Sequence, residues 1–305
     1  MAGTKKRARE DWFYHSHNFG ALPSELCSAG TSKIVLLPVP YEATTTYRPG
    51  CAGGPRAVIE ASANMELYDE ELLKETCEVG IHTSMPLDVV DDAEEMIERV
   101  EAVTTAYLRQ GKFITLLGGE HTVSLGAVRA LSRVHTELSV LFLDAHADFR
   151  KSYRGNKYNH ACVGRRIAEV CSVIQAGVRS LSAEEAVSLR KSKAVTFWAY
   201  EFLKSRGTEE QDALIERVVD RLAPDVYVSI DADVFDPSIM PAVGTPEPGG
   251  LVWHEVLGLL RAVAVARKVV GLDLVELAPV PGLVHPEFMA ARLLYKAWGY
   301  ALKVQ

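Results

Sequence analysis

Cysteine is scarce in this sequence: Cys27, Cys51, Cys77, Cys162 and Cys171 are five among 305 residues. Their number is odd, and no two of them form a C-x-x-C motif. Both facts argue against a disulfide framework and against a zinc site made of thiolates. We therefore expect free thiols in a reducing compartment, which indicates the cytoplasm.

Positive charge is also in short supply. The chain has 33 Lys and Arg against 40 Asp and Glu, a net charge of -7. Binding to nucleic acid or to an anionic membrane requires clustered positive charge, so we expect neither partner. No apolar run reaches the length of a membrane-spanning helix.

The amino-terminal segment lacks the apolar stretch of a secretory signal. Its first ten residues, MAGTKKRARE, are basic, and the next ten, DWFYHSHNFG, are not continuously apolar. We predict that residues 1–10 form a flexible tail.

No segment is polar or biased enough to be an interdomain linker, because the 22 glycines and 14 prolines are scattered. Hydrophobic residues make up 48% of the chain, which is enough for a full core. We predict a single domain over residues 1–305.

Short apolar runs rich in β-branched residues alternate with longer helical patterns, which is typical of a parallel sheet covered on both faces. Runs such as VYVSI and VVGLDLV are apolar throughout, as expected of strands buried on both sides. We predict an α/β fold of three layers, α/β/α, with a central and mainly parallel sheet. The expected strands cover residues 33–39, 113–117, 139–143, 172–176, 194–198, 226–230 and 269–275. The expected helices cover residues 55–68, 92–110, 123–133, 183–191, 209–222, 253–266 and 286–302.

Three of these strands are followed at once by clusters of polar residues. FITLL is followed by Gly-Gly-Glu-His, ending at His121; VLFL by Asp-Ala-His-Ala-Asp, residues 144–148; and YVSI by Asp-Ala-Asp, residues 231–233. Ligands of open parallel sheets bind outside the carboxyl ends of the strands. The clusters therefore predict a functional site at this edge.

The spacing of the clusters predicts a metal centre. In an extended chain, residues at i, i+2 and i+4 point to one side, so these side chains can converge. Four carboxylates at one point cannot all stay ionised without cations. Two ions roughly 3.5–4 Å apart that share carboxylates would use all the ligands. Oxygen and imidazole ligands without thiolate favour manganese, with magnesium, cobalt and iron as alternatives. The six candidate ligands are His121, Asp144, His146, Asp148, Asp231 and Asp233.

Each cluster also has a structural interpretation. A single D-x-D or G-G-x-H motif is more often a turn or capping feature than a metal site. Three alternating ionisable residues after a buried strand, however, would be costly without a ligand.

In this order and spacing, the motifs resemble the ureohydrolase family, which includes arginases and agmatinases, and are most similar to agmatinase-like members of the archaeal type. The resemblance runs from Arg48-Pro49-Gly50 and Gly54-Pro55-Arg56 through LLGGEHTVS, LDAHADFR, SIDADVFDPS and the segment 244–251 to LDLVELAP. It implies the arginase-like fold, two Mn²⁺ ions and a homo-oligomer, a trimer or hexamer.

The resemblance also implies how the metal ligands are shared. One manganese would be held by His121, Asp144, Asp148 and Asp231, and the other by His146, Asp144, Asp231 and Asp233. Asp144 and Asp231 would be the bridging carboxylates.

The resemblance gives two further residues a role in catalysis. Glu276 in VEL would bind the substrate guanidinium through paired hydrogen bonds, because the two groups have matching forked geometry. His160 in N-H-A-C would be a general acid or proton shuttle for the departing amine. Without the resemblance, Glu276 would more often be a surface ion pair, and His160 an ordinary loop histidine.

Arg150 bears on the substrate. Arginases have asparagine at this place, where it reads the amino-acid end of arginine, so Arg150 favours a decarboxylated guanidino amine. Agmatine and aminopropylagmatine are the expected substrates, yielding urea and the polyamine. The alternatives are a guanidino acid whose carboxylate binds Arg150, and arginine itself.

Two other classes of protein remain open at this stage. Paired metals also serve phosphoesterases, which should add a basic or glycine-rich phosphate site facing the metals. A homologue that keeps the ligands without turnover is a non-catalytic alternative. The remaining histidines (His15, His17, His82, His135, His254 and His285) are not assigned to the site.

Overall fold

A computed structural model describes residues 18–303. The tail predicted at residues 1–10, like His15 and His17, lies outside the described residues. An eight-stranded sheet of order β4-β1-β5-β10-β9-β6-β7-β8 crosses the described part, and all of its paired strands are parallel. Its strands are β1 Ile34–Val39, β4 Ile81–Thr83, β5 Phe113–Gly118, β6 Leu138–Leu143, β7 Ser172–Val178, β8 Val195–Trp198, β9 Asp225–Asp231 and β10 Lys268–Val275.

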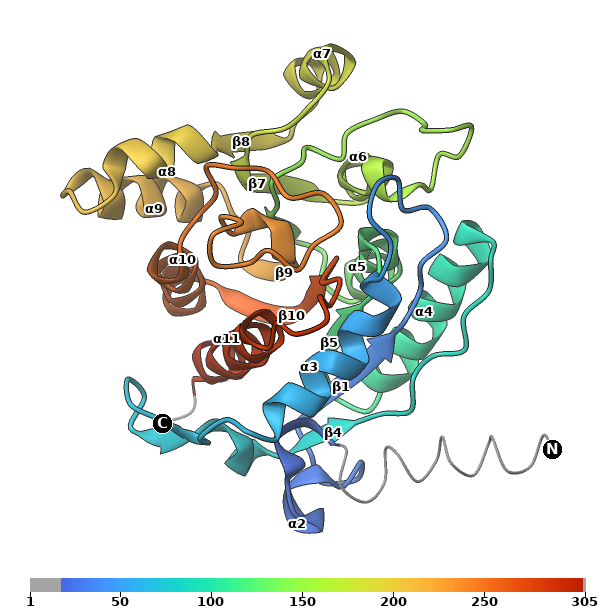
Figure 1. The fold of residues 1–305 in the computed structure, drawn as a ribbon, viewed down its shortest axis with the longest axis vertical. Helices are drawn as coiled ribbons and strands as arrows, with labels where there is room; N and C mark the ends of the chain where they lie inside the picture. Colours follow the sequence, from blue (N-terminus) through green and yellow to red (C-terminus); the bar gives the residue numbers. More distant parts are fainter. Residues whose placement is uncertain (1–17, 304–305) are drawn as a thin grey trace.

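Helices cover both faces of the sheet (Figure 1). One face packs against α4 Ala93–Leu108, α5 Ser124–Ser132 and α6 Val163–Ala168. The opposite face packs against α3 Gly54–Ser62, α8 Ala199–Ser205, α9 Glu210–Asp220, α10 Trp253–Ala266 and α11 His285–Ala301. A further helix, α7 Ala183–Lys191, follows β7. The predicted three-layer α/β/α fold is confirmed.

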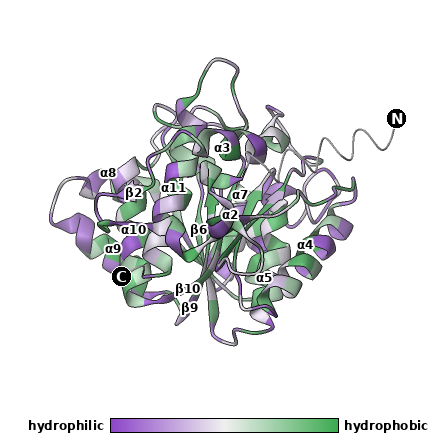
Figure 2. Cartoon of the chain, turned by 90° about the horizontal axis from the view of Figure 1, so that it is seen from below, coloured by the Kyte–Doolittle hydropathy of each residue, from purple (hydrophilic) through white to green (hydrophobic). Residues whose placement is uncertain are grey.

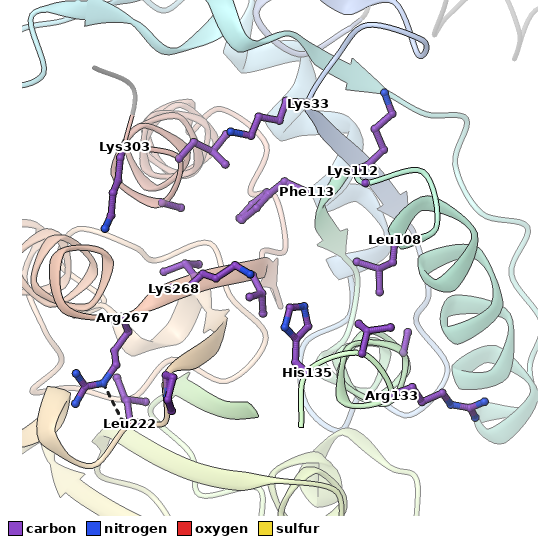
Figure 3. Close-up of a pocket in the computed structure, with 18 of the residues that line it drawn as sticks. Lys33, Leu108, Lys112, Phe113, Arg133, His135, Leu222, Arg267, Lys268 and Lys303 are labelled. Carbon is purple, nitrogen blue, oxygen red and sulfur yellow. Dashed lines mark hydrogen bonds between the residues drawn. The ribbon is translucent and has the colours of Figure 1, made fainter. Parts of the chain in front are cut away.

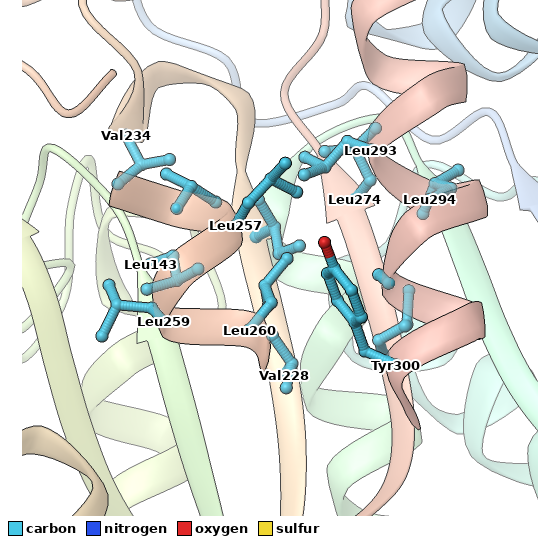
Figure 4. Close-up of a cluster of buried hydrophobic side chains, with 14 of the residues drawn as sticks. Leu143, Val228, Val234, Leu257, Leu259, Leu260, Leu274, Leu293, Leu294 and Tyr300 are labelled. Atoms are coloured by element: carbon cyan, nitrogen blue, oxygen red, sulfur yellow. The ribbon is translucent and has the colours of Figure 1, made fainter. Parts of the chain in front are cut away.

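Alternation along the strands divides the core into two halves. In β1, Ile34 and Leu36 belong to the cluster under α10 and α11, whereas Val35 and Leu37 belong to the cluster under α4 and α5. Such two-sided burial explains why the strands are apolar throughout. Figure 4 shows the first cluster, with side chains of α10 and α11 meeting those of the sheet. Figure 2 shows hydrophobic colour along the strands and hydrophilic colour on the outer helix surfaces.

All seven predicted strands and all seven predicted helices are present, with shifted ends. The helix expected at 55–68 ends at Ser62, where the backbone of Ala63 and Asn64 turns back on Ala61. The predicted ranges do not include β4, α6 and α8, which have three, six and seven residues and are too short for periodicity to set their bounds. It also missed the antiparallel pair β2 Tyr68–Asp69 and β3 Lys74–Glu75.

No helix in the described residues combines the length and the apolar character needed to cross a membrane.

Candidate metal centre and active site

The polar clusters meet at one edge because their strands are neighbours. Strands β5, β10, β9 and β6 are adjacent in the sheet and parallel. His121 follows β5, Glu276 follows β10, Asp231 ends β9, and Asp144 follows β6. The carboxyl ends of four central strands thus bring the predicted residues together, as expected for this class of fold.

His121 is the centre of the first ligand set. Its side chain is fully buried, and its Nδ1 atom lies 3.1 Å from Asp144 Oδ2, 3.3 Å from Asp231 Oδ2 and 3.6 Å from Asp148 Oδ2. The ring stacks on Phe142, with centroids 4.5 Å apart. One imidazole nitrogen therefore faces three carboxylates at once.

The second set is built around His146. Its Nδ1 atom lies 2.9 Å from Asp233 Oδ2 and 3.7 Å from Asp144 Oδ1. The two groups that could each hold an ion are His121, Asp144 and Asp231, and Asp144, His146 and Asp233. Asp144 belongs to both, as a bridging ligand would, while Asp231 belongs to the first alone.

Two polar atoms at the centre lack the partners that buried polar atoms need. His121 Nδ1 and Asp144 Oδ2 face each other, yet neither forms a hydrogen bond within the described residues. Such orphans are rare in native interiors and indicate a missing ion or water. The oxygen and imidazole donors suit a divalent cation at this point.

Charge repulsion points to the same conclusion. Burial, together with the charges of Asp233 and Asp144, raises the pKa of Asp231 well above its ordinary value. Burial and Asp144 do the same to the pKa of Asp148. Burial would also raise the pKa of Asp233, but the neighbouring His146 outweighs it and holds that pKa low. A cation would let all of these carboxylates remain ionised.

The backbone is strained where two of these side chains leave the sheet. Asp148 has φ +49° and Glu276 has φ +62°, both in the left-handed region that non-glycine residues seldom adopt. Strain of this kind persists where the surrounding structure enforces it, often at functional sites. The Glu276 turn is held by its N–H, which donates to Gly119 O at 2.8 Å.

The sequence did not reveal a chain of hydrogen bonds behind His121. Its Nε2 atom lies 2.9 Å from Ser229 Oγ, and Ser229 Oγ donates to Asp273 Oδ1 at 2.9 Å. Asp273 is fully buried and also accepts from the Tyr227 hydroxyl. These contacts fix the ring so that Nδ1 faces the ligand centre. Ser229 of β9 and Asp273 of β10 are partners in the sheet register. A polar residue inside each of two apolar strands is a signal that sequence analysis could have used.

Glu120 holds the loop that leads to the active-site entrance. Its buried carboxylate accepts from the backbone N–H of Ala43 and Thr44 and from the Thr44 hydroxyl, at 2.7–2.9 Å. Thr44 Oγ1 in turn accepts from the backbone N–H of His160 at 2.9 Å. Glu120 therefore positions the loop rather than taking part in the ligand sets.

Glu276 and His160 lie next to each other beside the ligand centre. His160 Nδ1 is 3.7 Å from Glu276 Oε1, which also accepts from the His121 backbone N–H at 2.7 Å. Burial, with the charges of Asp231 and Glu120, raises the pKa of Glu276 well above its usual range. Burial, with the positive charges of His146 and His121, lowers the pKa of His160 to about 4.

Glu276 and His160 line a cavity of about 300 Å³ beside the ligand sets. Arg150 is in its wall, stacks on the Tyr153 ring at 4.7 Å, and has its Nη2 atom 3.6 Å from Glu185 Oε2. Glu185 is itself buried and accepts from the backbone N–H of Phe149 and Ser182. The charge of Arg150 is thus partly balanced within the wall.

Two of the unassigned histidines have partners outside this centre. His82 Nδ1 contacts Cys27 O at 3.0 Å, and His135 Nδ1 lies 2.7 Å from Asp225 Oδ2. Their separation from the ligand sets agrees with the sequence analysis.

The fold and the paired ligand sets define a protein built to hold a binuclear metal centre. The profile of the Arginase family matches residues 32–299, and the chain belongs to this family. Members depend on two metal ions. This result confirms the family predicted from the sequence motifs.

Individual relatives cover most of the chain. It is 40% identical over 283 residues to the N(1)-aminopropylagmatine ureohydrolase of Synechocystis sp., covering 90% of this chain and 91% of that one. It is 33% identical to the agmatinase of Pyrococcus horikoshii, covering 88% and 92%. The solved structure of the agmatine ureohydrolase of Thermoplasma volcanium superposes with a TM-score of 0.84 at 32% identity, covering 98% of both chains.

Proposed function

We propose that this protein hydrolyses the guanidino group of agmatine or aminopropylagmatine, releasing urea and the polyamine. The observation that carries the proposal is the position of Glu276, a buried carboxylate with a raised pKa directly beside the two ligand sets. A cationic substrate bound there satisfies Glu276 and brings its central carbon to the metal centre.

The ligand sets suit two divalent cations, and we propose manganese. His121, Asp144, Asp148 and Asp231 would hold one ion, and His146, Asp144, Asp231 and Asp233 the other. When bound, the ions would supply a water activated for attack at neutral pH. The donor set has no thiolate, since the cysteines of the described residues lie outside both metal groups.

Glu276 would orient the substrate. Its Oε1 accepts one hydrogen bond, from the His121 N–H, and can accept a second, while Oε2 has no hydrogen-bond partner among the described residues. Both oxygens can therefore accept from a guanidinium in a forked contact, which a simple ammonium cannot form.

His160 would move a proton to the departing amine. Burial, the largest cause, lowers its pKa below the usual value and keeps the imidazole neutral near pH 7. A neutral ring would accept a proton during the attack and pass it to the leaving nitrogen, which would make His160 a proton shuttle rather than a stored acid. Its Nε2 atom lies 3.4 Å from Thr46 Oγ1 at the cavity wall.

We propose that Arg150 shapes the distal end of the substrate site. Because Glu185 partly balances its charge, Arg150 attracts a substrate carboxylate less than a free guanidinium would. This favours agmatine and aminopropylagmatine over guanidinobutyrate and arginine.

We also propose a single domain, a homo-oligomer that is a trimer or hexamer, and a cytoplasmic location. The free cysteines of the described residues suit a reducing compartment.

A urea-release assay with Mn²⁺ across agmatine, aminopropylagmatine, guanidinobutyrate and arginine tests the substrate. We expect the highest kcat/KM for one of the two amines. A higher value for guanidinobutyrate or arginine would refute the assignment of the amine class.

The same preparation separates the other classes of function. Phosphate release from phosphoesters without urea release would indicate a phosphoesterase. Bound metal without turnover of any of the four substrates would indicate a non-catalytic homologue. Among the described residues of the cavity wall, Arg150 is the one Lys or Arg, which argues against a phosphate site there.

A further inference from the structure

A second cavity lies at the opposite edge of the sheet from the metal centre. It has a volume of about 1110 Å³ and is lined by seven Lys and Arg residues and one histidine, while no Asp or Glu of the described residues belongs to its lining. Figure 3 shows Lys33, Lys268, Lys303 and His135 around the hollow. The basic residues are Lys33, Arg109, Lys112, Arg133, His135, Arg267, Lys268 and Lys303.

Three of the lysines sit at the amino ends of three neighbouring strands. Lys33 precedes β1, Lys112 precedes β5 and Lys268 begins β10, and these strands are adjacent in the order β1-β5-β10. The backbone N–H of Phe113 donates to Lys33 O, which places the first two strand starts side by side. Like charges on neighbouring strands are destabilising unless something compensates them. Lys112 Nζ is compensated by donating to Gly30 O and Ser32 O, which leaves Lys33 and Lys268.

Interaction with helix ends explains four of the seven Lys and Arg residues that line the cavity. Arg109, Arg133, Arg267 and Lys303 follow the carboxyl ends of α4, α5, α10 and α11, where cations are favourable. Arg267 donates to Leu222 O and Val219 O at the end of α9, in keeping with this role. The strand lysines Lys33 and Lys268 have no such helix end to complement.

Internal partners do not neutralise the cavity. Arg133 is paired with Glu101, and Asp225 is held by His135. Glu101 offsets one of the seven positive charges and the four helix ends offset about two more, so roughly four positive charges remain. Within the part of the chain that the structure describes, the Lys33, Lys268 and Lys303 side chains form no hydrogen bond or ion pair. In a chain with net charge -7, this concentration of positive charge is local.

The lining also has an apolar part. Phe113, Leu108 and Leu222 contribute to the cavity, and its volume of about 1110 Å³ slightly exceeds the range of roughly 300–1,000 Å³ typical of small-molecule sites. A cationic wall with an apolar floor suits a compact anion of several charges attached to an organic group.

We propose that this cavity binds a di- or triphosphate group, carried by a nucleotide or present as free inorganic polyphosphate. Lys33, Lys268 and Lys303 are the cations available to it. The site is separate from the metal centre by the length of β10, eight residues or about 25 Å.

Calorimetric titration of the metal-loaded enzyme, in buffer without free metal, tests the proposal with ADP, tripolyphosphate and adenosine. We expect both anions to bind with Kd below about 1 mM, more weakly as salt is raised, and adenosine not to bind. Equal binding of the two anions would show that the cavity recognises the phosphates alone. Tighter binding of ADP would show that the apolar lining also contributes to the affinity. The metal content, measured before and after, shows whether a signal comes from chelation.

Two double variants with the same change in charge localise the binding. Lys33→Gln/Lys268→Gln should weaken ADP binding about tenfold or more, because it removes two cations of the cavity. Lys193→Gln/Lys204→Gln, on exposed positions outside the cavity lining, should bind ADP like the unmodified protein. No binding of either anion up to about 1 mM, or equal binding by both double variants, would overturn the proposal.

Discussion

At the scale of single residues, the protonation of His121 couples metal binding to pH. Burial acts to lower its pKa, but the negative charges of the neighbouring Asp144 and Asp148 outweigh burial and raise the pKa to about 9. His121 is therefore protonated near pH 7 when no metal is bound, and Nδ1 must release that proton to become a ligand. We predict that manganese affinity rises from pH 6.5 to about pH 9, with proton release on binding. Calorimetry in buffers of different ionisation enthalpy measures both, and an affinity independent of pH would contradict it.

Substitution of a metal ligand and substitution of a proton-transfer residue should affect bound metal and turnover differently. Asp231→Ala removes a carboxylate of the first ligand set, so bound metal and urea release should fall together. Metal analysis after dialysis, with kcat measured on the same sample, checks this. If Asp231→Ala retained as much metal as the unmodified protein, Asp231 would not be a metal ligand.

His160→Ala is the matched contrast. His160 belongs to neither ligand set, so metal content should stay near normal while kcat falls roughly 100-fold or more. Full turnover in this variant would contradict the proton-shuttle role.

The sequence singled out the candidate ligands because polar clusters directly after buried strands leave a local signal. Five of these candidates are His121, Asp144, His146, Asp231 and Asp233, which the structure brings together in the two groups that could each hold an ion. The hydrogen bonds from His121 through Ser229 to Asp273 join residues 108 and 44 positions apart, in the turn after β5 and on the strands β9 and β10. The register of these elements depends on tertiary packing. The pairing of Arg150 with Glu185 is also non-local, so the sequence could not show that the charge of Arg150 is partly balanced.

At the scale of elements, the turn after β5 is the least tolerant segment. A Cβ atom added to Gly119 would lie 1.9 Å from Tyr41 O, and the chain on both sides is fixed by hydrogen bonds to Val39 and Tyr41. We predict that Gly119→Ala lowers the free energy of unfolding by about 2–3 kcal/mol and reduces bound metal, because the turn carries His121.

Gly30→Ala is the control for this turn. No atom lies within 4 Å of a Cβ added there, and we expect a change below about 0.5 kcal/mol. Denaturant unfolding of both variants measures the difference. Equal stability of the two would show that the turn relaxes more easily than its contacts indicate.

Long elements were predictable and short ones were not. The sixteen residues of α4 show several periods of the helical pattern, and Asp92 caps the helix by accepting from Glu95 N–H. By contrast, β4 is three residues long, and it forms by pairing with β1 rather than by its own propensity. The strand order joins residues far apart in the chain, which no local pattern records.

At the scale of the whole molecule, the metals should contribute to stability. Without cations, the buried carboxylates repel one another, so ions that bind the folded chain stabilise it by linkage. Free metal at about 100 times its Kd contributes about 2.7 kcal/mol. We predict that EDTA lowers Tm by roughly 5 °C and that added Mn²⁺ restores it.

Differential scanning calorimetry of the unmodified protein and Asp231→Ala tests this prediction. EDTA should shift Tm strongly in the first and little in the second, since the variant has already lost a ligand. An identical Tm with and without EDTA in the unmodified protein would show that the ligand edge is stable without ions.

The metal-binding groups leave the ends of central strands, whereas Thr46, Tyr153 and Thr245 reach the cavity from three separate surface loops. Metal binding and substrate specificity therefore depend on different segments of the chain. Substitutions in the loops of Tyr153 and Thr245 could therefore alter the tail that the substrate carries without changing the metal-binding groups.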